Sequence, residues 1–322
     1  MASGKIYAIS DLHVDQLENM KWVEGLSDGK YLNDTIIVAG DITHVLSKLA
    51  LTLKALKSKF KDVYYCPGNH ELWTQSCRED NELQVDNSIE KFHHIIELCD
   101  TIGVRTRPGI TEQGVTIIPL FGWYDESLHI PGPELESDIR LWSDYHRCVW
   151  TDVSEKRTVL FYLKCFLIQK EKTKQEVPRG KAAEYFVKLN EANLLDFQDK
   201  TKHPKIITFS HFLTSKKLME AYRDEMQRRR AYARKSEKQT AGEQERTSAV
   251  RKANFSLVAG TELLDKQLQV IKPQIHIFGH SHRKMILNIG DEIRYVNNPL
   301  GYTYERDSRL IEPPYELYEI VL

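Results

Sequence analysis

The chain has 322 residues, of which 41% are hydrophobic and 28% charged, as in ordinary globular proteins and unlike disordered or fibrous chains. Its 45 lysines and arginines against 46 aspartates and glutamates give a formal net charge of -1, which excludes a global attraction to nucleic acid or anionic membranes. No run of 18 apolar residues is present, so we expect no membrane span and no membrane partner.

The first residues and the cysteines together predict a cytoplasmic location. The start, MASGKIYAIS, enters a strand-like run without the long apolar segment of a secretory signal. The cysteines are odd in number and show no C-x-x-C spacing, which argues against a disulfide framework and a zinc-thiolate site. They are Cys66, Cys77, Cys99, Cys148 and Cys165.

Short continuous apolar runs predict β-strands that are covered on both faces. In chain order these runs are residues 5–10, 35–39, 63–66, 115–120, 205–209, 274–278, 294–297 and 315–322. Apolar residues at helical spacing separate the early runs, at 45–59 and 87–99. The order strand, helix, strand, helix, strand predicts an α/β protein built from stacked sheet and helix layers.

Two segments differ in character from the rest, and we expect a single domain over 1–322 with insertions at about 123–160 and 214–255. Residues 123–150 carry aromatics, two prolines and acids, and predict a long functional loop. Residues 216–252 are polar and helix-prone, with twelve basic against six acidic residues. This basic segment predicts a solvated helical face, a lid that gathers a phosphate-rich substrate, or a local nucleic-acid site.

Five of the strand-like runs end at residues of the types that bind metals. These residues, in chain order, are Asp11, His13, Asp41, Asn69, His70, His211, His280 and His282. Because ligands bind outside the carboxyl ends of strands in α/β sheets, we expect the five loops to converge on one site. Glycines precede Asp41, Asn69 and His280, where they let the backbone turn tightly and come close to bound ions.

This mixture of ligand types indicates a particular class of metal. Carboxylates, imidazoles and an amide oxygen, without thiolates, suit Mn, Fe, Zn, Co or Ni rather than calcium, and we favour manganese. So many ligands exceed what one tetrahedral ion uses, and a bridging aspartate would let two ions lie about 3.5–4 Å apart. Such a pair generates hydroxide from a shared water and clamps the attacking and leaving oxygens of a phosphoryl displacement.

The motifs D-x-H, G-D, G-N-H-E, a single His and G-H-x-H, in this order over residues 5–282, resemble those of the calcineurin-like metallophosphoesterase superfamily. The resemblance implies a four-layer αββα sandwich of two mixed β-sheets flanked by helices. It also implies two metal sites that share Asp41 as a bridge. One site would comprise Asp11, His13, Asp41 and His282, and the other Asp41, Asn69, His211 and His280. His70 resembles the residue that protonates the leaving oxygen or positions the phosphate.

One departure from the superfamily concerns the substrate. Its protein phosphatases extend the second motif to GDxxDRG, whereas this sequence reads GDITHVL from Gly40 and lacks the later Asp and Arg. This argues against a protein phosphatase and leaves His44 as a candidate substrate contact. Trp123 and Tyr124, which follow another strand, could line the substrate pocket or stack a base, with core packing as the alternative.

We therefore expect an enzyme that hydrolyses a phosphodiester or nucleotide-type substrate through a metal-bridging hydroxide. A phosphomonoesterase acting on a small metabolite is the nearest alternative. A protein-binding scaffold without activity is an alternative of another class, and the complete set of ligand residues argues against it. Nucleic-acid binding through the basic segment 216–252 is a third alternative.

Overall fold

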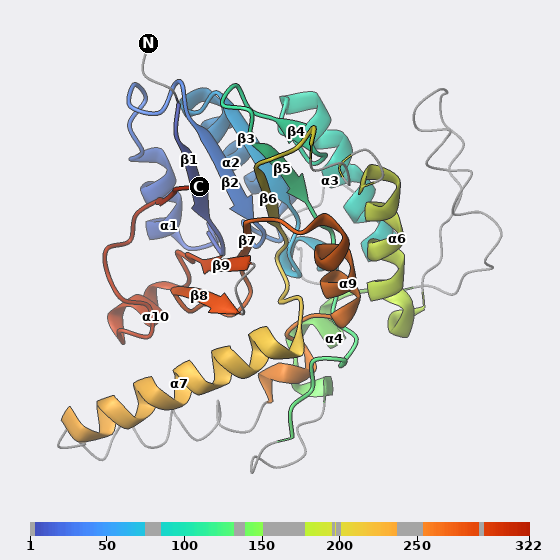
Figure 1. Cartoon of the computed structure of the whole chain (residues 1–322), viewed down its shortest axis with the longest axis vertical. Helices are drawn as coiled ribbons and strands as arrows, with labels where there is room; N and C mark the ends of the chain where they lie inside the picture. The colour runs from blue at the N-terminus through green and yellow to red at the C-terminus, as the bar shows by residue number, and fades with distance from the viewer. Residues whose placement is uncertain are drawn as a thin grey trace.

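The computed structural model describes residues 4–74, 85–131, 139–150, 178–194, 197, 201–236, 254–289 and 293–322. Two mixed β-sheets lie face to face, and helices cover their outer faces (Figure 1). This is the α/β sandwich that the resemblance implied. The described part of the chain contains no helix long and apolar enough to cross a membrane.

The first sheet has four strands in the order β10-β1-β2-β3. They are β1 (Ile6–Ile9), β2 (Thr35–Ala39), β3 (Asp62–Cys66) and β10 (Tyr318–Ile320). Strands β1, β2 and β3 are parallel, whereas β10 pairs antiparallel to β1 and brings the end of the chain beside its beginning. The loops that follow the three parallel strands therefore leave the same edge of the sheet.

The second sheet has six strands in the order β4-β5-β6-β7-β9-β8. They are β4 (Gly109–Ile110), β5 (Thr116–Pro119), β6 (Ile206–Phe209), β7 (Ile275–Phe278), β8 (Met285–Ile289) and β9 (Ile293–Asn297). The central strands β5, β6, β7 and β9 are parallel, and β4 and β8 close the two edges in antiparallel pairs.

The helices surround these sheets. They are α1 (Leu17–Glu24), α2 (Leu46–Lys59), α3 (Ser88–Ile102), α4 (Ser143–Arg147), α6 (Ala182–Leu194), α7 (Lys216–Ser236), α9 (Glu262–Ile271) and α10 (Thr303–Asp307). Short 3-10 turns are η1 (His70–Leu72), η2 (Ile139–Leu141), η3 (Arg179–Lys181) and η5 (Phe255–Leu257). Helix α3 runs beyond its predicted end because Gly103 supplies the left-handed C-cap, with φ 80°.

Burial on both faces explains why the strands read as continuous apolar runs. In β1, Ile6 and Ala8 pack into the core between the sheets, whereas Tyr7 and Ile9 pack outward against α1, α2 and α3. The outer face of the second sheet is covered by α6, α7 and α9 in the same manner. Two covered faces leave no solvent side, so apolar residues occupy successive positions rather than alternate ones.

The predicted strands are confirmed, with ends that shift by at most three residues. The sequence reading missed β4, which has two residues, and β8, whose burial alternates because one of its faces is exposed. Both are edge strands, and neither has the apolar run of a doubly covered strand. The first part of the basic segment 216–252 forms α7, while residues 237–252 lie outside the described residues.

The buried histidine of β7 generates a prediction for stability against pH. His276 is fully buried and bonded to the hydroxyls of Thr208 and Ser210, and burial lowers its pKa from 6.5 to about 3. Between these values the unfolded chain binds a proton that the folded chain does not, so stability falls as the pH falls below 6.5. We expect His276→Gln to make this slope shallower, by up to about 1.4 kcal/mol per pH unit.

Urea unfolding at several values between about pH 6.5 and pH 4.5 measures that slope. The exposed His129, changed to Gln, serves as the matched control. An unchanged slope in His276→Gln, or an equal change in the control, would contradict the prediction.

Candidate metal centre

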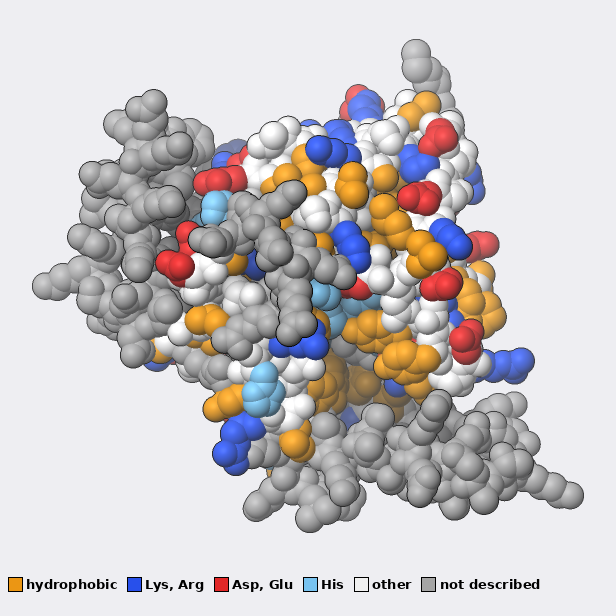
Figure 2. All heavy atoms as spheres, turned by 180° about the vertical axis from the view of Figure 1, so that it is seen from behind, with side chains coloured by type: hydrophobic (Ala, Val, Ile, Leu, Met, Phe, Trp, Pro, Cys, Tyr) orange, Lys and Arg blue, Asp and Glu red, His pale blue; other side chains and the backbone are white. Residues whose placement is uncertain are grey.

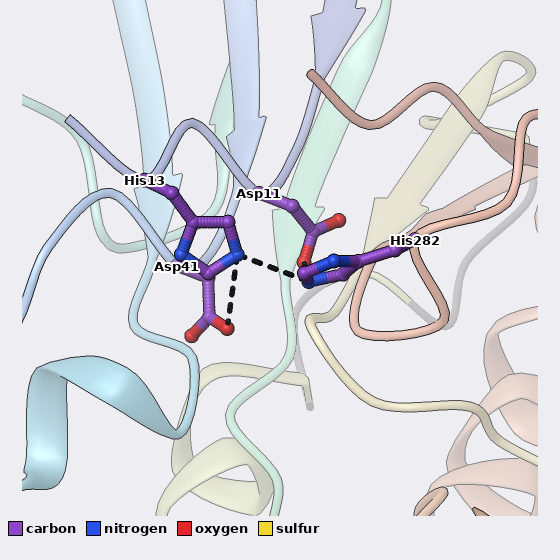
Figure 3. A group of neighbouring side chains, drawn as sticks. All are labelled: Asp11, His13, Asp41 and His282. Carbon is purple, nitrogen blue, oxygen red and sulfur yellow. Dashed lines mark hydrogen bonds and ion pairs between the residues drawn. The ribbon is translucent and has the colours of Figure 1, made fainter. Parts of the chain in front are cut away.

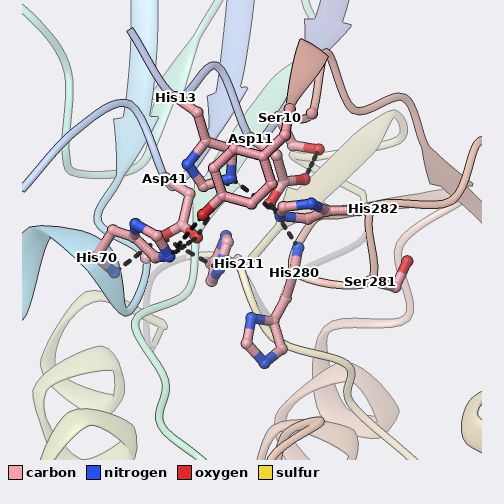
Figure 4. Close-up of polar contacts among 12 residues, drawn as sticks. Ser10, Asp11, His13, Asp41, His70, His211, His280, Ser281 and His282 are labelled. Carbon is pink, nitrogen blue, oxygen red and sulfur yellow. Dashed lines mark hydrogen bonds and ion pairs between the residues drawn. The ribbon is translucent and has the colours of Figure 1, made fainter. Parts of the chain in front are cut away.

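The sequence-predicted ligands lie in loops at the carboxyl ends of parallel strands from both sheets. In the first sheet, β1 leads to Asp11 and His13, β2 to Asp41, and β3 to Asn69. In the second sheet, β6 leads to His211, and β7 leads to His280 and His282. The structure brings these residues together below the strand ends (Figures 3 and 4).

The backbone at most of these residues has an uncommon conformation. Positive φ angles between 41° and 65° occur at Asp11, His13, Asp41, His280 and His282. A left-handed backbone is rare for residues other than glycine and costs about 1–3 kcal/mol at each position unless the surroundings enforce it. Such strain concentrates at functional sites, so this clustering marks these loops as shaped for a site rather than for folding stability.

The glycines in these loops are required by close approach. A Cβ atom at Gly68 would lie 2.2 Å from Oδ1 of Asp41, and one at Gly40 would lie 2.4 Å from Nδ1 of His211. Gly40 also has a φ of 78°. Any side chain at either position would push the ligand side chains apart, as the sequence pattern led us to expect.

The first cluster contains Asp11, His13, Asp41 and His282, whose candidate ligand atoms all lie within 4.8 Å of one another (Figure 3). The Nε2 atoms of His13 and His282 are 3.0 Å apart, and Nε2 of His282 is 3.4 Å from Oδ1 of Asp11. Asp11, His13 and Asp41 are almost completely buried, whereas His282 is partly exposed.

The second cluster contains Asp41, His211 and His280, again with ligand atoms within 4.8 Å of one another. Nε2 of His211 lies 3.4 Å from Oδ1 of Asp41 and 3.0 Å from Oδ1 of Asn69, which adds an amide oxygen to the group. The other nitrogens of His211 and His280 pair with backbone carbonyls, at Ala39 and Val258. Asp41 is therefore common to both clusters.

These donor atoms fit a pair of divalent cations. Two ligands on opposite sides of one ion, each bound at about 2.0–2.2 Å, lie at most about 4.4 Å apart, close to the spacing within each cluster. Imidazole, carboxylate and amide donors without thiolate suit the transition metals predicted from the sequence. Cys66, at the end of β3, lies near the ligand Asn69 in sequence. Burial raises the pKa of its thiol, so the thiol stays protonated and does not act as a thiolate ligand.

Neighbouring carboxylates raise the pKa of two histidines of the site. Burial would lower the pKa of His282, but the charges of Glu305 and Asp11 raise it to about 10. The pKa of His211 rises to about 9 because the charge of Asp41 outweighs burial. Burial would raise the pKa of Asp11, but His282 brings it down to about 2. Metal binding must displace the histidine protons and therefore weakens as the pH falls.

Glu71 holds the loops that carry Asp41 and Asn69, a role that the sequence reading missed. Its fully buried carboxylate accepts hydrogen bonds from the backbone N–H groups of Gly68, Asp41, Ile42 and Thr43, at 2.6–3.0 Å. Burial and the charge of Asp41 nonetheless raise the pKa of Glu71 to about 7. Glu71 is the last residue of the G-N-H-E motif, so its position in that motif was the available signal.

Glu305, from α10 near the end of the chain, orients His282. Its Oε2 atom accepts from Nδ1 of His282 at 2.7 Å and from the backbone N–H of Tyr302 at 2.9 Å. The first contact places the proton on Nδ1, so Nε2 is the nitrogen that faces Asp11 and His13. The Tyr302 ring stacks on His13, with 4.2 Å between centroids. No sequence motif pointed to either residue.

Asp144, from the short helix α4, orients Asn69. Its Oδ1 atom accepts from Nδ2 of Asn69 at 2.9 Å and from Nε1 of Trp73 at 2.6 Å, while burial raises its pKa to about 6. Because the amide nitrogen of Asn69 is held by Asp144, its oxygen turns toward His211. One carboxylate thus fixes both a predicted metal ligand and the tryptophan that packs against His70.

His70 lies beside Asp41 and is partly exposed (Figure 4). Its Nε2 atom is 3.7 Å from Oδ2 of Asp41 and 3.4 Å from the hydroxyl of Tyr302. The ring packs on Trp73, with centroids 3.7 Å apart. Burial lowers the pKa of His70 to about 4, so its imidazole is neutral near pH 7 and offers a single N–H donor.

The three predicted substrate contacts occupy different surroundings. His44 lies 3.5 Å from the carboxylate of Asp15 and near Trp73, with 5.7 Å between ring centroids. Trp123 and Tyr124 are almost entirely buried in the core, where both pack on Phe212. Their placement agrees with the core-packing alternative rather than with a pocket wall.

The space-filling view shows that one face of the molecule is hollowed near its middle, with histidine side chains at the wall of the hollow (Figure 2). His70, His280 and His282 are the partly exposed members of the site, whereas the aspartates and His13 lie beneath them. A ligand from solvent would therefore meet the histidines first.

In sequence and in fold the chain is similar to phosphoesterases. The model of the family described as calcineurin-like phosphoesterase matches residues 4–284. The curated acyl-carrier-protein phosphodiesterase PptH of Mycobacterium tuberculosis is 35% identical over 132 residues, a stretch that covers only 39% of this chain and 39% of that protein. The chain also superposes on a crystal structure of phosphopantetheinyl hydrolase (PptH) from that species, with a TM-score of 0.64 and 22% identity. The match covers 99% of this chain and 96% of the PptH chain. This second likeness shows the fold alone.

The buried Glu71 carboxylate generates a prediction about the stability of the loops. Glu71→Gln keeps the size of the side chain but replaces one acceptor oxygen by an amide that cannot accept from the backbone N–H groups. We expect a loss of about 1–3 kcal/mol in the free energy of unfolding, together with weaker metal retention. Chemical denaturation and metal analysis of the purified variant measure the two effects.

Glu112→Gln is the matched control, because Glu112 has a side chain 73% exposed to solvent and, among the described residues, pairs with Lys61 at the surface. This change should stay within about 0.5 kcal/mol of the original protein. Equal stability of the Glu71 and Glu112 variants would contradict the role given to Glu71.

Proposed function

The chain belongs to the calcineurin-like phosphoesterases, which are metal-dependent phosphoester hydrolases, and on this premise we propose that it hydrolyses a phosphodiester with two divalent ions. The observation that carries the proposal is the buried Asp41, shared by two clusters of candidate ligands and adjacent to His70. One set of ligands is Asp11, His13, Asp41 and His282, and the other is Asp41, Asn69, His211 and His280.

In this proposal the ions supply Lewis acidity, polarising the phosphoryl oxygens and lowering the pKa of a bound water toward neutrality. The chain supplies orientation and a hydrogen-bond donor. Because the imidazole of His70 is neutral near pH 7, its ring N–H donates a hydrogen bond to the leaving oxygen, which gains negative charge as the bond to phosphorus breaks. Tyr302 and Trp73 support this role, because they contact the imidazole and hold it beside Asp41.

A diester substrate is supported by two observations. The chain lacks the Asp and Arg that extend the second motif in protein phosphatases. The relative PptH is a phosphodiesterase of acyl carrier protein, and an alternative description of it is phosphopantetheinyl hydrolase. We therefore propose, as the first substrate to test, a phosphopantetheine group joined to a carrier protein through a phosphodiester. His44 lies at the His70 side of the site and is the proposed substrate contact.

Other sequence-based expectations stay proposals. These are manganese as the metal, a cytoplasmic location, and a single domain with insertions at about 123–160 and 214–255. The cysteines support a reducing compartment, since Cys66 and Cys99 are buried and form no disulfide within the described part of the chain. Nucleic-acid binding by the basic segment has weaker support, because Glu225 pairs with both Arg228 and Arg229 on α7.

The reaction is tested with bis-p-nitrophenyl phosphate and p-nitrophenyl phosphate, using protein that is stripped of metal and then given Mn. We expect metal-dependent turnover with a preference for the diester, and a loss of about 10²–10⁴-fold in rate for His70→Ala at unchanged metal content. The exposed His129→Ala serves as the control. A preference for the monoester would favour the phosphomonoesterase, and metal binding without turnover of either compound would favour the scaffold.

The shared aspartate is tested by metal content. Asp41→Asn keeps the shape but removes the negative charge that faces both clusters, so we expect both ions to bind more weakly and activity to fall with them. Elemental analysis after gel filtration counts the bound metal per chain. Two retained ions with full activity would rule out Asp41 as the bridge.

A further inference from the structure

Arg147, the last residue of α4, lies one aromatic ring away from His70. Its guanidinium carbon is 4.4 Å from the centroid of the Trp73 ring, and the same ring packs on His70. Trp73 is itself fixed by the hydrogen bond from its indole N–H to Asp144. The charged end of Arg147 is thus tied to the His70 side of the site.

The backbone around Arg147 is held as firmly as its side chain. The carbonyl of Arg147 accepts from the backbone N–H of Thr74, which follows Trp73 directly in the chain. The N–H of Cys148 donates to the carbonyl of Asp144 and closes the helix. Helix α4 and the segment after β3 are therefore joined at several points, so Arg147 has little freedom to leave this side of the site.

The guanidinium has no charged partner within the described part of the chain. Other arginines are paired: Arg105 with Asp62, Arg229 with Glu225, and Arg283 with Glu305. Arg147 makes no side-chain hydrogen bond or ion pair among the described residues, and it is partly exposed. An arginine is charged at all ordinary pH values and can bind two oxygens of a phosphate at once, so a partly exposed guanidinium that lacks a charged partner among the described residues is suited to an anion on this side of the site.

We propose that Arg147 binds an anionic oxygen of the substrate's phosphate on the His70 side of the site. The proposal rests on the proposed function and adds to it a substrate-binding residue that lies outside the sequence motifs. In this proposal Arg147, on α4, supplies a positive charge that the protein phosphatases of the superfamily carry instead on the arginine of their second motif. The cation–π contact with Trp73 restricts the guanidinium and reduces the entropy lost on binding.

The test compares Arg147→Met with Arg147→Lys in metal-loaded protein. The first readout is the Kd of inorganic phosphate from calorimetric titration. The second readout is KM and kcat for bis-p-nitrophenyl phosphate, measured separately so that an effect on one can be told from an effect on the other. We expect Arg147→Met to weaken phosphate binding about tenfold or more and to raise KM by a similar factor, with bound metal unchanged. Arg147→Lys should recover part of the loss, because it keeps the charge but not the planar fork.

Arg107→Met is the matched control, since Arg107 pairs with Asp100 at the surface and belongs to no part of the site. Unchanged phosphate binding in Arg147→Met, or an equal effect in the control, would overturn the proposal. So would a loss of metal or of thermal stability in both Arg147 variants, which would show a packing role. If the original protein hydrolyses no diester, the proposed function fails, but the phosphate titration still tests Arg147.

Discussion

The site depends on one buried carboxylate that faces several histidines. Asp41 is 1% exposed and lies within 4.0 Å of ring nitrogens of His13, His70 and His211. An isolated buried carboxylate would be costly, and here neighbouring histidine charges hold its pKa well below the ordinary value despite burial. Asp41 also accepts from the backbone N–H of His70, so it links the candidate metal ligands to the histidine proposed to contact the leaving oxygen.

Three further carboxylates hold the side chains and loops around Asp41, and each comes from a different part of the chain. Glu71 binds the backbone of the loops after β2 and β3, Asp144 turns the amide of Asn69, and Glu305 sets the proton on His282. Each of these contacts fixes a loop or a side chain of the site, and those of Glu71 hold the backbone at the left-handed Asp41. Orientation is thus supplied by residues that would not touch a metal themselves.

The same arrangement separates two kinds of aromatic side chain. Trp73 and Tyr302 lie against His70 and His13, where they fix imidazole rings that face the site. Trp123 and Tyr124 instead fill the core behind Phe212. Both kinds lie in segments that follow a β-strand, and only the direction in which each segment turns assigns a ring to the site or to the core.

The sequence alone determined the strands that are covered on both faces and the candidate ligands, because both are local. A strand covered on two faces must be apolar throughout, and a ligand that follows such a strand must lie at its carboxyl end. Tertiary structure alone decided the residues that orient these ligands. Asp144 lies 75 residues from Asn69, and Arg147 reaches His70 only through Trp73. Such contacts arise where distant segments pack together, and neither periodicity nor spacing along the chain encodes them.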